Sequence, residues 1–415
     1  MTAEAMRPEF EYTDNLHARH RAGRIWHLVF QAATIVGIIA LTALLLNILD
    51  QSLGYAVYEA KVDPATLAMN GIPLEELPKA DLVHILQGNL SSGAFNKLNH
   101  EQPFNERSRQ NVYALVIERV VRYKIVESWN LWESLLNAGE IRARAAQQHP
   151  DAELRFVSWL RADFISRPQS SEPVTAGVRT AILGSLWTIL ITILLAFPLG
   201  VGAAIYLEEY AGSSWINRII QTNINNLAGV PSIIYGILGL AIFVRALEPL
   251  TSGAVFGFVD PTTANGRTVL SAGLTLGLLV LPVIIINSQE AIRAVPQSLR
   301  KASYSLGATK WQTVWSHVLP NALPGILTGT ILAISRAIGE TAPLVVIGAS
   351  TAISFDPASP FSKFTTLPIQ IYQWTARPQE EFRHLAAAAI LVLLALLLSL
   401  NASAVLMRTR FSRKF

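Results

Sequence analysis

PQSLRKASYSLGATKWQTVWSHVLP, residues 296–320, and ILTGTILAISRAIGETAPLVVIG, residues 326–348, decide how the chain is interpreted. The first segment is basic and aromatic and is interrupted by Gly307, whereas the second is long and apolar enough to cross a membrane. Arg336 and Glu340 stand inside the apolar run, where a central charge costs about 2.5–3.5 kcal/mol on insertion scales. This combination predicts a protein that moves a solute across a membrane under the control of another protein.

The whole chain is too apolar for an ordinary soluble protein. Of its 415 residues, 51% are hydrophobic and 15% are charged, against about 25% charged in soluble domains. The apolar runs lack the alternation of membrane-barrel strands, and only helices and closed barrels satisfy the backbone in lipid. The sequence therefore predicts an all-α membrane protein, a six-helix transmembrane bundle. The predicted spans lie near residues 28–49, 180–206, 219–244, 268–289, 321–347 and 385–407.

Basic residues cluster in three segments that an even number of spans places on one side. Since cytoplasmic flanks carry an excess of Lys and Arg, we expect both termini and the 290–320 loop in the cytoplasm of a multi-pass protein of the bacterial plasma (inner) membrane. The first apolar run is too long for a typical signal peptide, and we expect it to be a retained anchor. The basic residues are Arg7, Arg19, Arg21 and Arg24, then Arg293, Arg300, Lys301 and Lys310, then Arg408, Arg410, Arg413 and Lys414.

The predicted domain organisation follows from these spans. A basic tail (1–27), a first span (28–49), an extracytoplasmic loop (50–177), a permease core of five spans (178–407) and a basic tail (408–415) follow one another. Val112, Val116 and Val120 recur at helical spacing in the long loop, which predicts a small helical region there. It is either a cap on the bundle or a surface for an extracytoplasmic partner. The chain has no cysteine, which excludes disulfides, thiolate metal sites and a cysteine nucleophile.

The third predicted span contains helix breakers and polar residues. Residues 227–236 read LAGVPSIIYG, and a Gly-Val-Pro inside a span is tolerated only against protein or a water-filled path. One interpretation is a proline kink packed against its neighbours. The other is a path lined by Asn226, Ser232 and Tyr235.

Arg336 and Glu340 are the only charged residues inside the six predicted spans. Their i,i+4 spacing predicts that they share a helical face. They either form a buried pair that fixes helix packing, or Arg336 binds an anion in transit while Glu340 orients it and helps release. The second interpretation is attractive because a guanidinium donates two parallel hydrogen bonds to an oxyanion.

We name residues 296–320 the elbow loop. Pro296 suits the first turn of a helix, and Gly307 suits the left-handed position that ends one. A second segment follows with Trp311 and Trp315 on one face, and we expect Leu319-Pro320 to end it. The pattern predicts two short amphipathic helices joined at a glycine, which either lie on lipid or insert into a partner protein.

The elbow loop resembles that of type I importer permeases of the ATP-binding cassette (ABC) class. Their pattern is Glu-Ala-Ala, three residues, Gly, nine residues, Ile, one residue, Leu-Pro. The spacing is kept throughout, and Lys301 stands in place of the motif's glutamate. Ala302, Gly307, Leu319 and Pro320 match the pattern, whereas Lys301, Ser303 and His317 depart from it.

The surrounding segments narrow the resemblance. SRAIGETAPL (335–344), LAGVPSIIYG and the ending RFSRKF (410–415) resemble the PstA family, one of the two kinds of permease in the phosphate-specific (Pst) importers. The sister permeases of the PstC family share Gly-Glu-Thr but usually not the following Ala-Pro-Leu. The resemblance covers about residues 178–415 and the first span, and residues 50–170 are longer than this family leads us to expect.

This resemblance implies the type I ABC importer permease fold and a transmembrane permease subunit of an ATP-driven importer of inorganic phosphate, working by alternating access. It implies a PstC-like permease partner in a heterodimer, two PstB-like ATP-binding subunits and an extracytoplasmic PstS-like phosphate-binding protein. No cofactor is expected on this chain, since ATP and Mg would be held by the ATPase. The elbow loop would couple the ATPase to the spans through Leu299, Lys301, Ala302, Ser303, Leu306, Gly307, Ala308, Leu319 and Pro320.

The chain is not expected to be an enzyme. It contains no G-x-x-x-x-G-K-[ST], HExxH or G-x-S-x-G motif, so ATP hydrolysis would fall to partner subunits. Two alternatives stay open. One is a permease of the same class for another oxyanion, such as phosphonate, sulfate or molybdate. The other is a stand-alone secondary transporter, which would have no need of the elbow loop.

Overall fold

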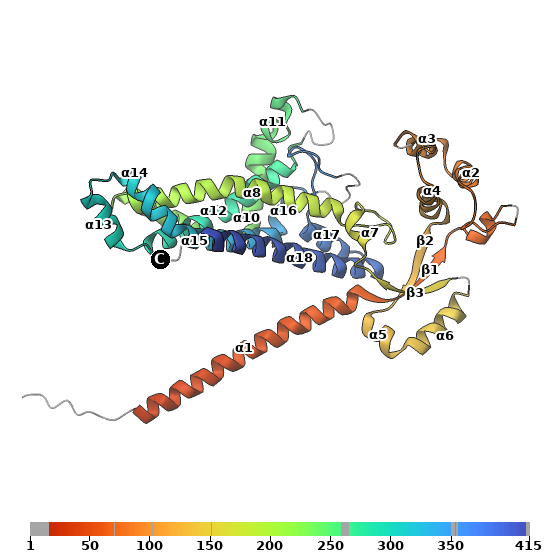
Figure 1. Ribbon diagram of the computed structural model, residues 1–415, viewed down its shortest axis with the longest axis horizontal. Coiled ribbons are helices and arrows are strands. Elements are labelled where there is room, and N and C mark those ends of the chain that lie inside the picture. The colour runs from red at the N-terminus through yellow and green to blue at the C-terminus, as the bar shows by residue number, and fades with distance from the viewer. Residues whose placement is uncertain are drawn as a thin grey trace, which may run out of the picture.

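The computed structural model describes residues 16–69, 71–101, 103–150, 152–258, 265–349, 353 and 356–411. Long helices form a bundle, and a smaller region with a β-sheet joins it at one end (Figure 1). The elbow loop, the start of the first helix and the C-terminal end lie toward the opposite end. Arg7, Arg413, Lys414 and most of the RFSRKF segment from the predicted tails lie outside the described residues.

Five helices of the described residues are long and apolar enough to cross a membrane. The helix with the first predicted span begins within the tail expected at residues 1–27, so Arg19, Arg21 and Arg24 are helical. Its most apolar stretch buries none of its residues, and it diverges from the other helices (Figure 1). The five are α1 (Leu16–Ser52), α8 (Arg179–Ile205), α12 (Val269–Arg293), α15 (Leu319–Gly339) and α18 (Glu380–Phe411).

The third predicted span is bent rather than straight. α9 (Trp215–Ala228) meets the helix formed by α10 (Ser232–Gly239) and η4 (Leu240–Ala246) at 106°. Pro231 forces the preceding residue out of the helical region, which explains the break. The bundle therefore has six spans only if this bent pair counts as one.

Close packing of α8 against α12 forms the centre of the bundle. A Cβ atom on Gly200 would lie 2.6 Å from Cγ2 of Ile284, so only a hydrogen fits between the two helices there. Thr192 Oγ1 donates a hydrogen bond to the Gly273 carbonyl at 3.1 Å, which ties the same helices together. Small residues at a helix interface allow the two backbones to approach this closely.

The extracytoplasmic loop predicted at residues 50–177 was expected to hold a small helical region. Residues 53–178, which we name the sheet domain, also contain a three-stranded antiparallel sheet. Its order is β2-β1-β3, with β1 (Leu53–Ala60), β2 (Tyr123–Ser128) and β3 (Glu153–Ser158). The pairing register of β1 shifts between Val57 and Tyr58, and both of these consecutive residues are buried. β1 therefore lacks the alternation of buried and exposed side chains that reveals a strand in a sequence. The predicted helices are present as well: Val112, Val116 and Val120 are buried.

The helices of the sheet domain are short. They are η1 (Pro64–Leu67), α2 (Lys79–Asn89), α3 (Ser92–Glu101), α4 (Arg109–Val116), η2 (Ile117–Val121), α5 (Leu131–Leu136), α6 (Ala138–Gln148) and α7 (Ala162–Ser166). The remaining short elements of the chain are η3 (Tyr206–Tyr210), α11 (Glu248–Thr251), η5 (Ala254–Phe256), α13 (Gln297–Ser305), α14 (Lys310–Thr313), η6 (Val314–Val318), α16 (Ala342–Val346) and α17 (Leu367–Thr375).

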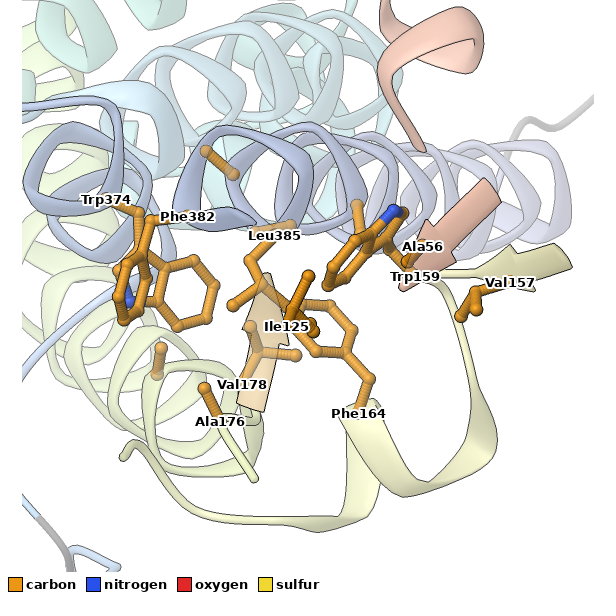
Figure 2. Packing of buried hydrophobic residues seen from close by; sticks show 14 of the residues in the cluster. Ala56, Ile125, Val157, Trp159, Phe164, Ala176, Val178, Trp374, Phe382 and Leu385 are labelled. Atoms are coloured by element: carbon orange, nitrogen blue, oxygen red, sulfur yellow. The ribbon is translucent and has the colours of Figure 1, made fainter. Parts of the chain in front are cut away.

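One hydrophobic cluster joins the sheet domain to the bundle (Figure 2). The Phe164 ring of α7 lies 6.0 Å from the Trp374 ring of α17, and the Phe382 ring of α18 lies 6.3 Å from Trp374. All three side chains are buried. Residues from the sheet, including Ile125, complete the same cluster. The sheet domain is therefore packed onto the bundle through a common core.

Candidate functional site

The elbow loop forms the helical hairpin that the sequence predicted. α13 ends at Ser305 with Leu306 as its C-cap, and Gly307 follows with φ +81°, a conformation that favours glycine. Thr309 then caps α14 in a capping box with Gln312. The two helices are closed on each other by a buried hydrogen bond of 2.9 Å between the hydroxyls of Ser303 and Thr313.

The second helix of the hairpin does not end at Leu319-Pro320. α14 continues through the π-helical turn η6 into α15. The amide of Leu319 bonds the carbonyl of Val314, and this π-helical turn accommodates Pro320, which has no N–H to donate. The elbow loop is thus continuous with a membrane-spanning helix, and the prediction that the helix ends at Leu319-Pro320 is wrong.

The hairpin has one packed side and one open side. Val314 and Val318 are each 1% exposed, and Val318 belongs to a hydrophobic cluster against which Leu299 packs. Leu306 is 90% exposed at the tip, and Trp311 and Trp315, each 59% exposed, stack with centroids 5.4 Å apart. Lys301 and Ala302 are exposed, Ala308 is half-buried, and Ser303 is buried. The structure thus brings most predicted coupling residues onto one exposed hairpin, while Leu299, Ser303, Leu319 and Pro320 belong to its base and packing.

Two consecutive acids fasten the hairpin to the bundle, and no prediction from the sequence included them. Glu209 accepts two hydrogen bonds from Arg300, at 2.7 and 3.0 Å, and both side chains are only 8% exposed. Arg300 also donates to the carbonyls of Ile292 and Val295. We name the Glu209–Arg300 pair the elbow clamp. A signal in the sequence could have revealed it: Glu208 and Glu209 follow the second predicted span, and Arg293 and Arg300 follow the fourth.

Glu208 makes a parallel connection. It accepts two hydrogen bonds from Arg293, at 2.6 and 2.8 Å, and one from Gln289 at 3.0 Å. The turn η3 after α8 is therefore joined both to the end of α12 and to α13. Paired guanidinium–carboxylate contacts fix direction as well as distance, so the hairpin and the end of α8 are held as one unit.

The predicted Arg336–Glu340 pair is present, but it lies at a helix break. Arg336 Nε donates to Glu340 Oε1 at 3.3 Å. α15 ends at Gly339, Glu340 has extended backbone (φ −73°, ψ 121°), and α16 begins at Ala342. A helix running through Pro343 would clash with the carbonyl of Gly339, four residues earlier. The predicted continuous span 321–347 is thus corrected, as is the idea that both residues share a helical face.

The break after α15 lies against the helix that follows the break after α9. A Cβ atom on Gly236 of α10 would lie 2.6 Å from Cα of Pro343, so the two segments touch directly. Tyr235 packs in one cluster with Ala333 and Ala337 of α15. Two interrupted helices therefore meet near Arg336, which is the kind of place where irregular backbone lines a path in membrane proteins.

The other predicted path residues differ in their exposure and in their contacts. The Tyr235 hydroxyl donates to the Leu227 carbonyl at 2.8 Å, so it satisfies backbone freed by the bend. Ser232 is half-buried, and Asn226 is exposed on α9. The Arg336 side chain is 49% exposed and that of Glu340 is 17% exposed. Arg336 is thus the predicted path residue that combines charge, access and a position at a break.

Metal binding has no support in the described residues. No group of three or more His, Asp or Glu side chains in the described ranges is placed to hold a metal ion.

Comparisons with known proteins identify the family of the chain. Residues 196–415 match the family model "Binding-protein-dependent transport system inner membrane component". The phosphate transport system permease protein PstA 1 of Mycobacterium tuberculosis (strain CDC 1551 / Oshkosh) is 34% identical over 244 residues, which is 59% of this chain and 74% of that protein. The phosphate transport system permease protein PstC of Xylella fastidiosa (strain 9a5c) is 34% identical over 248 residues, 57% of this chain and 75% of its own.

A third relative is named by class alone. YqgI of Bacillus subtilis (strain 168), whose name reads "Probable ABC transporter permease protein", is 32% identical over 219 residues, 52% of this chain and 68% of that protein. The matched family covers more than half of the chain. The chain therefore belongs to the binding-protein-dependent transport system inner membrane components, as a multi-pass membrane protein with the type I ABC importer permease fold.

Proposed function

We propose that this chain is the PstA-type permease of an ATP-driven importer of inorganic phosphate. The observation that carries the proposal is the similarity to permeases named for phosphate transport, at 34% identity over more than half of the chain. The segment Thr341–Leu344 favours a PstA-type over a PstC-type permease, as the sequence resemblance implied. The half-exposed guanidinium of Arg336 at a helix break adds chemical support.

The proposed role of Arg336 follows from its surroundings. A planar guanidinium matches a tetrahedral oxyanion through paired hydrogen bonds. Glu340 competes for the same donors at 3.3 Å, so a phosphate would be held against a rival carboxylate and released when the pair closes. Asn226 and Ser232 would line the approach, while Tyr235 holds the bend beside it.

The proposed coupling runs through the elbow loop. The exposed tip formed by Leu306, Trp311 and Trp315 would enter a groove on an ATPase subunit. Closure of the ATPase pair would move the hairpin, and the elbow clamp would carry that motion to α8 and α12. ATP and Mg would stay on the ATPase subunits, and this chain would bind no cofactor itself.

The proposed assembly and orientation are those of a four-component importer. A PstC-like permease would supply the other half of the path, two PstB-like subunits would hydrolyse ATP, and a PstS-like protein would deliver phosphate from outside. Both termini and the elbow loop would face the cytoplasm. The elbow loop, the start of α1 and the end of α18 all lie toward one end of the bundle, which supports this orientation (Figure 1).

Reconstitution tests the proposal. The chain is purified from native membranes with the subunits that accompany it and placed in proteoliposomes with the phosphate-binding protein. We expect ATP-dependent accumulation of labelled phosphate that excess sulfate and molybdate do not reduce. Accumulation of another oxyanion instead would assign a different substrate, and accumulation without ATP would favour a secondary transporter.

A further inference from the structure

We propose that one face of α5, formed by Trp132, Leu135 and Leu136, inserts into the membrane surface on the sheet-domain side of the bundle. We name these three side chains the α5 face. They are 53%, 60% and 79% exposed, respectively. Apolar side chains of this size rarely gather on an open surface without a partner, and neither the elbow loop nor the Arg336 site uses them.

The helix spacing puts the three side chains on one side of α5. They stand at positions i, i+3 and i+4, which are neighbours on a helical surface. Ser134 is 1% exposed and points the other way, where its hydroxyl accepts a hydrogen bond from the Tyr55 amide of β1 at 2.9 Å. The Asn130–Glu133 capping box fixes the start of the helix. The α5 face is therefore held outward by the contacts that bind α5 to the sheet.

The position of α5 along the membrane normal is set by α1. The Trp132 amide donates to Asp50 Oδ1 at 2.8 Å. Asp50 directly follows the apolar run of α1, which ends with Ile48 and Leu49. α5 therefore lies where α1 leaves the hydrocarbon, beside that end of the helix (Figure 1). This boundary is the zone that Trp prefers, since its ring is apolar and its N–H needs a polar partner.

Lipid is the occupant that these observations favour. The end of α1 beside α5 also exposes apolar side chains, with Leu44 and Leu46 58% and 50% exposed. A fully buried aromatic side chain covers about 150–250 Å², and the three side chains are only partly exposed, so the α5 face offers less than the roughly 800 Å² per partner of a stable protein interface. A helix face with Trp and Leu side chains instead suits the membrane interface, where such a face is buried at the boundary of headgroups and acyl chains. The anchor adds a second attachment of the sheet domain to that made by the common core.

The absence of cysteine from the chain makes a direct test clean. A spin label is attached to Leu136→Cys in the full-length chain, purified with its accompanying subunits and placed in vesicles of phosphatidylethanolamine and phosphatidylglycerol. Collisions with oxygen, which concentrates in lipid, are compared with collisions with a water-soluble nickel chelate. Ile38→Cys on α1, 59% exposed, is the lipid control, and Gln87→Cys, exposed on α2, is the water control.

We expect the oxygen-to-nickel collision ratio at Leu136 to shift away from the Gln87 value toward the Ile38 value. Leu135→Cys is expected to give the same shift, which guards against a local defect in one variant. A ratio equal to that at Gln87 would place the α5 face in water and overturn the proposal. Low collision rates with both reagents would show a protein covering the face and would overturn it as well. Neither outcome depends on which solute the transporter carries.

Discussion

Arg336 and Arg300 show that the function of an arginine depends on its surroundings. Arg300 is nearly enclosed, and Glu209 and two backbone carbonyls occupy its donors. Arg336 is half exposed and, among the described residues, forms one hydrogen bond, to Glu340. The first arrangement is structural, because a fully satisfied buried ion has nothing left to offer a ligand. The second leaves donors for a passing anion, on which the proposed transport role depends.

Replacement of Arg336 by glutamine should reduce phosphate uptake roughly ten- to hundredfold, because a hydrogen bond to a charged group contributes about 1.5–3 kcal/mol. Labelled phosphate uptake at equal membrane abundance measures the effect. Arg336→Lys is the matched control. It keeps the charge but loses the planar guanidinium that donates two parallel hydrogen bonds, so its phosphate uptake should lie between that of the unaltered chain and that of Arg336→Gln. Uptake at the unaltered level in Arg336→Gln would assign this residue to helix packing alone.

Replacement of Glu209 by glutamine should destabilise the protein by about 3–5 kcal/mol, because it leaves the buried Arg300 without its carboxylate. Thermal unfolding of the purified chain measures this loss. Adding Arg300→Met should recover part of it, since the unpaired charge is then removed. Glu208→Gln should cost less, because its partner Arg293 is 61% exposed. Equal effects of the Glu208 and Glu209 changes would contradict the assigned burial.

At the scale of elements, the sequence predicted apolar helices well and their interruptions poorly. Spans such as α8 and α12 were found because about twenty consecutive apolar residues have few other uses. The end of α15 at Gly339 was missed because the run stays apolar to Ile347, and only Pro343 hints at the break. The opposite error occurred at Pro320, where the turn η6 lets the helix continue. Proline alone does not reveal whether a helix stops, bends or absorbs it.

Substitutions in the elbow loop test the coupling proposal. Leu306→Asp should leave ATP hydrolysis running without phosphate uptake, because it puts a charge at the apolar tip that is 90% exposed. Gly307→Pro should do the same, since proline fixes φ near −65° where the backbone needs +81°. Uptake and hydrolysis are measured together in proteoliposomes.

Two controls accompany these variants. Ser298→Asp places the same charge in the first turn of α13, where the helix dipole tolerates an acid, and should leave coupling intact. Gly307→Asn should also be tolerated, because asparagine enters the left-handed region more readily than other side chains. Normal uptake in both Leu306→Asp and Gly307→Pro would remove the elbow loop from the coupling route.

At the scale of the whole molecule, the bundle and the sheet domain share one core. A cap on the bundle was one interpretation of the sequence, but the residues that make this contact were not predicted. Ile125, Phe164 and Trp374 come from segments far apart in sequence, and no local pattern marks them as neighbours. β1 was hidden for a related reason, since its bulge removes the alternation and its partners lie more than 60 residues away. Long-range pairing of this kind needs the folded chain, whereas the elbow loop could be predicted from spacing within 25 residues.

Phe164→Ala should loosen the sheet domain from the bundle at a cost of about 3–5 kcal/mol, the usual range for removing a buried phenylalanine ring. Hydrogen exchange should rise in β1, β2 and β3 while α12 stays protected. Leu82→Ala is the control, because Leu82 belongs to a separate cluster within the sheet domain; its effect should stay near α2 and α4. If Phe164→Ala raised exchange only within α7, the common core would not be what holds the domain in place.

The most direct test of the central proposal is phosphate uptake in the native cell. Labelled phosphate at micromolar concentration is supplied to cells with this chain deleted and then restored, with excess sulfate and molybdate as competitors. We predict that uptake is lost on deletion, returns with the intact chain but not with Arg336→Gln, and ignores both competitors. Restoration that sulfate or molybdate abolishes would contradict the assignment of phosphate as the transported ion.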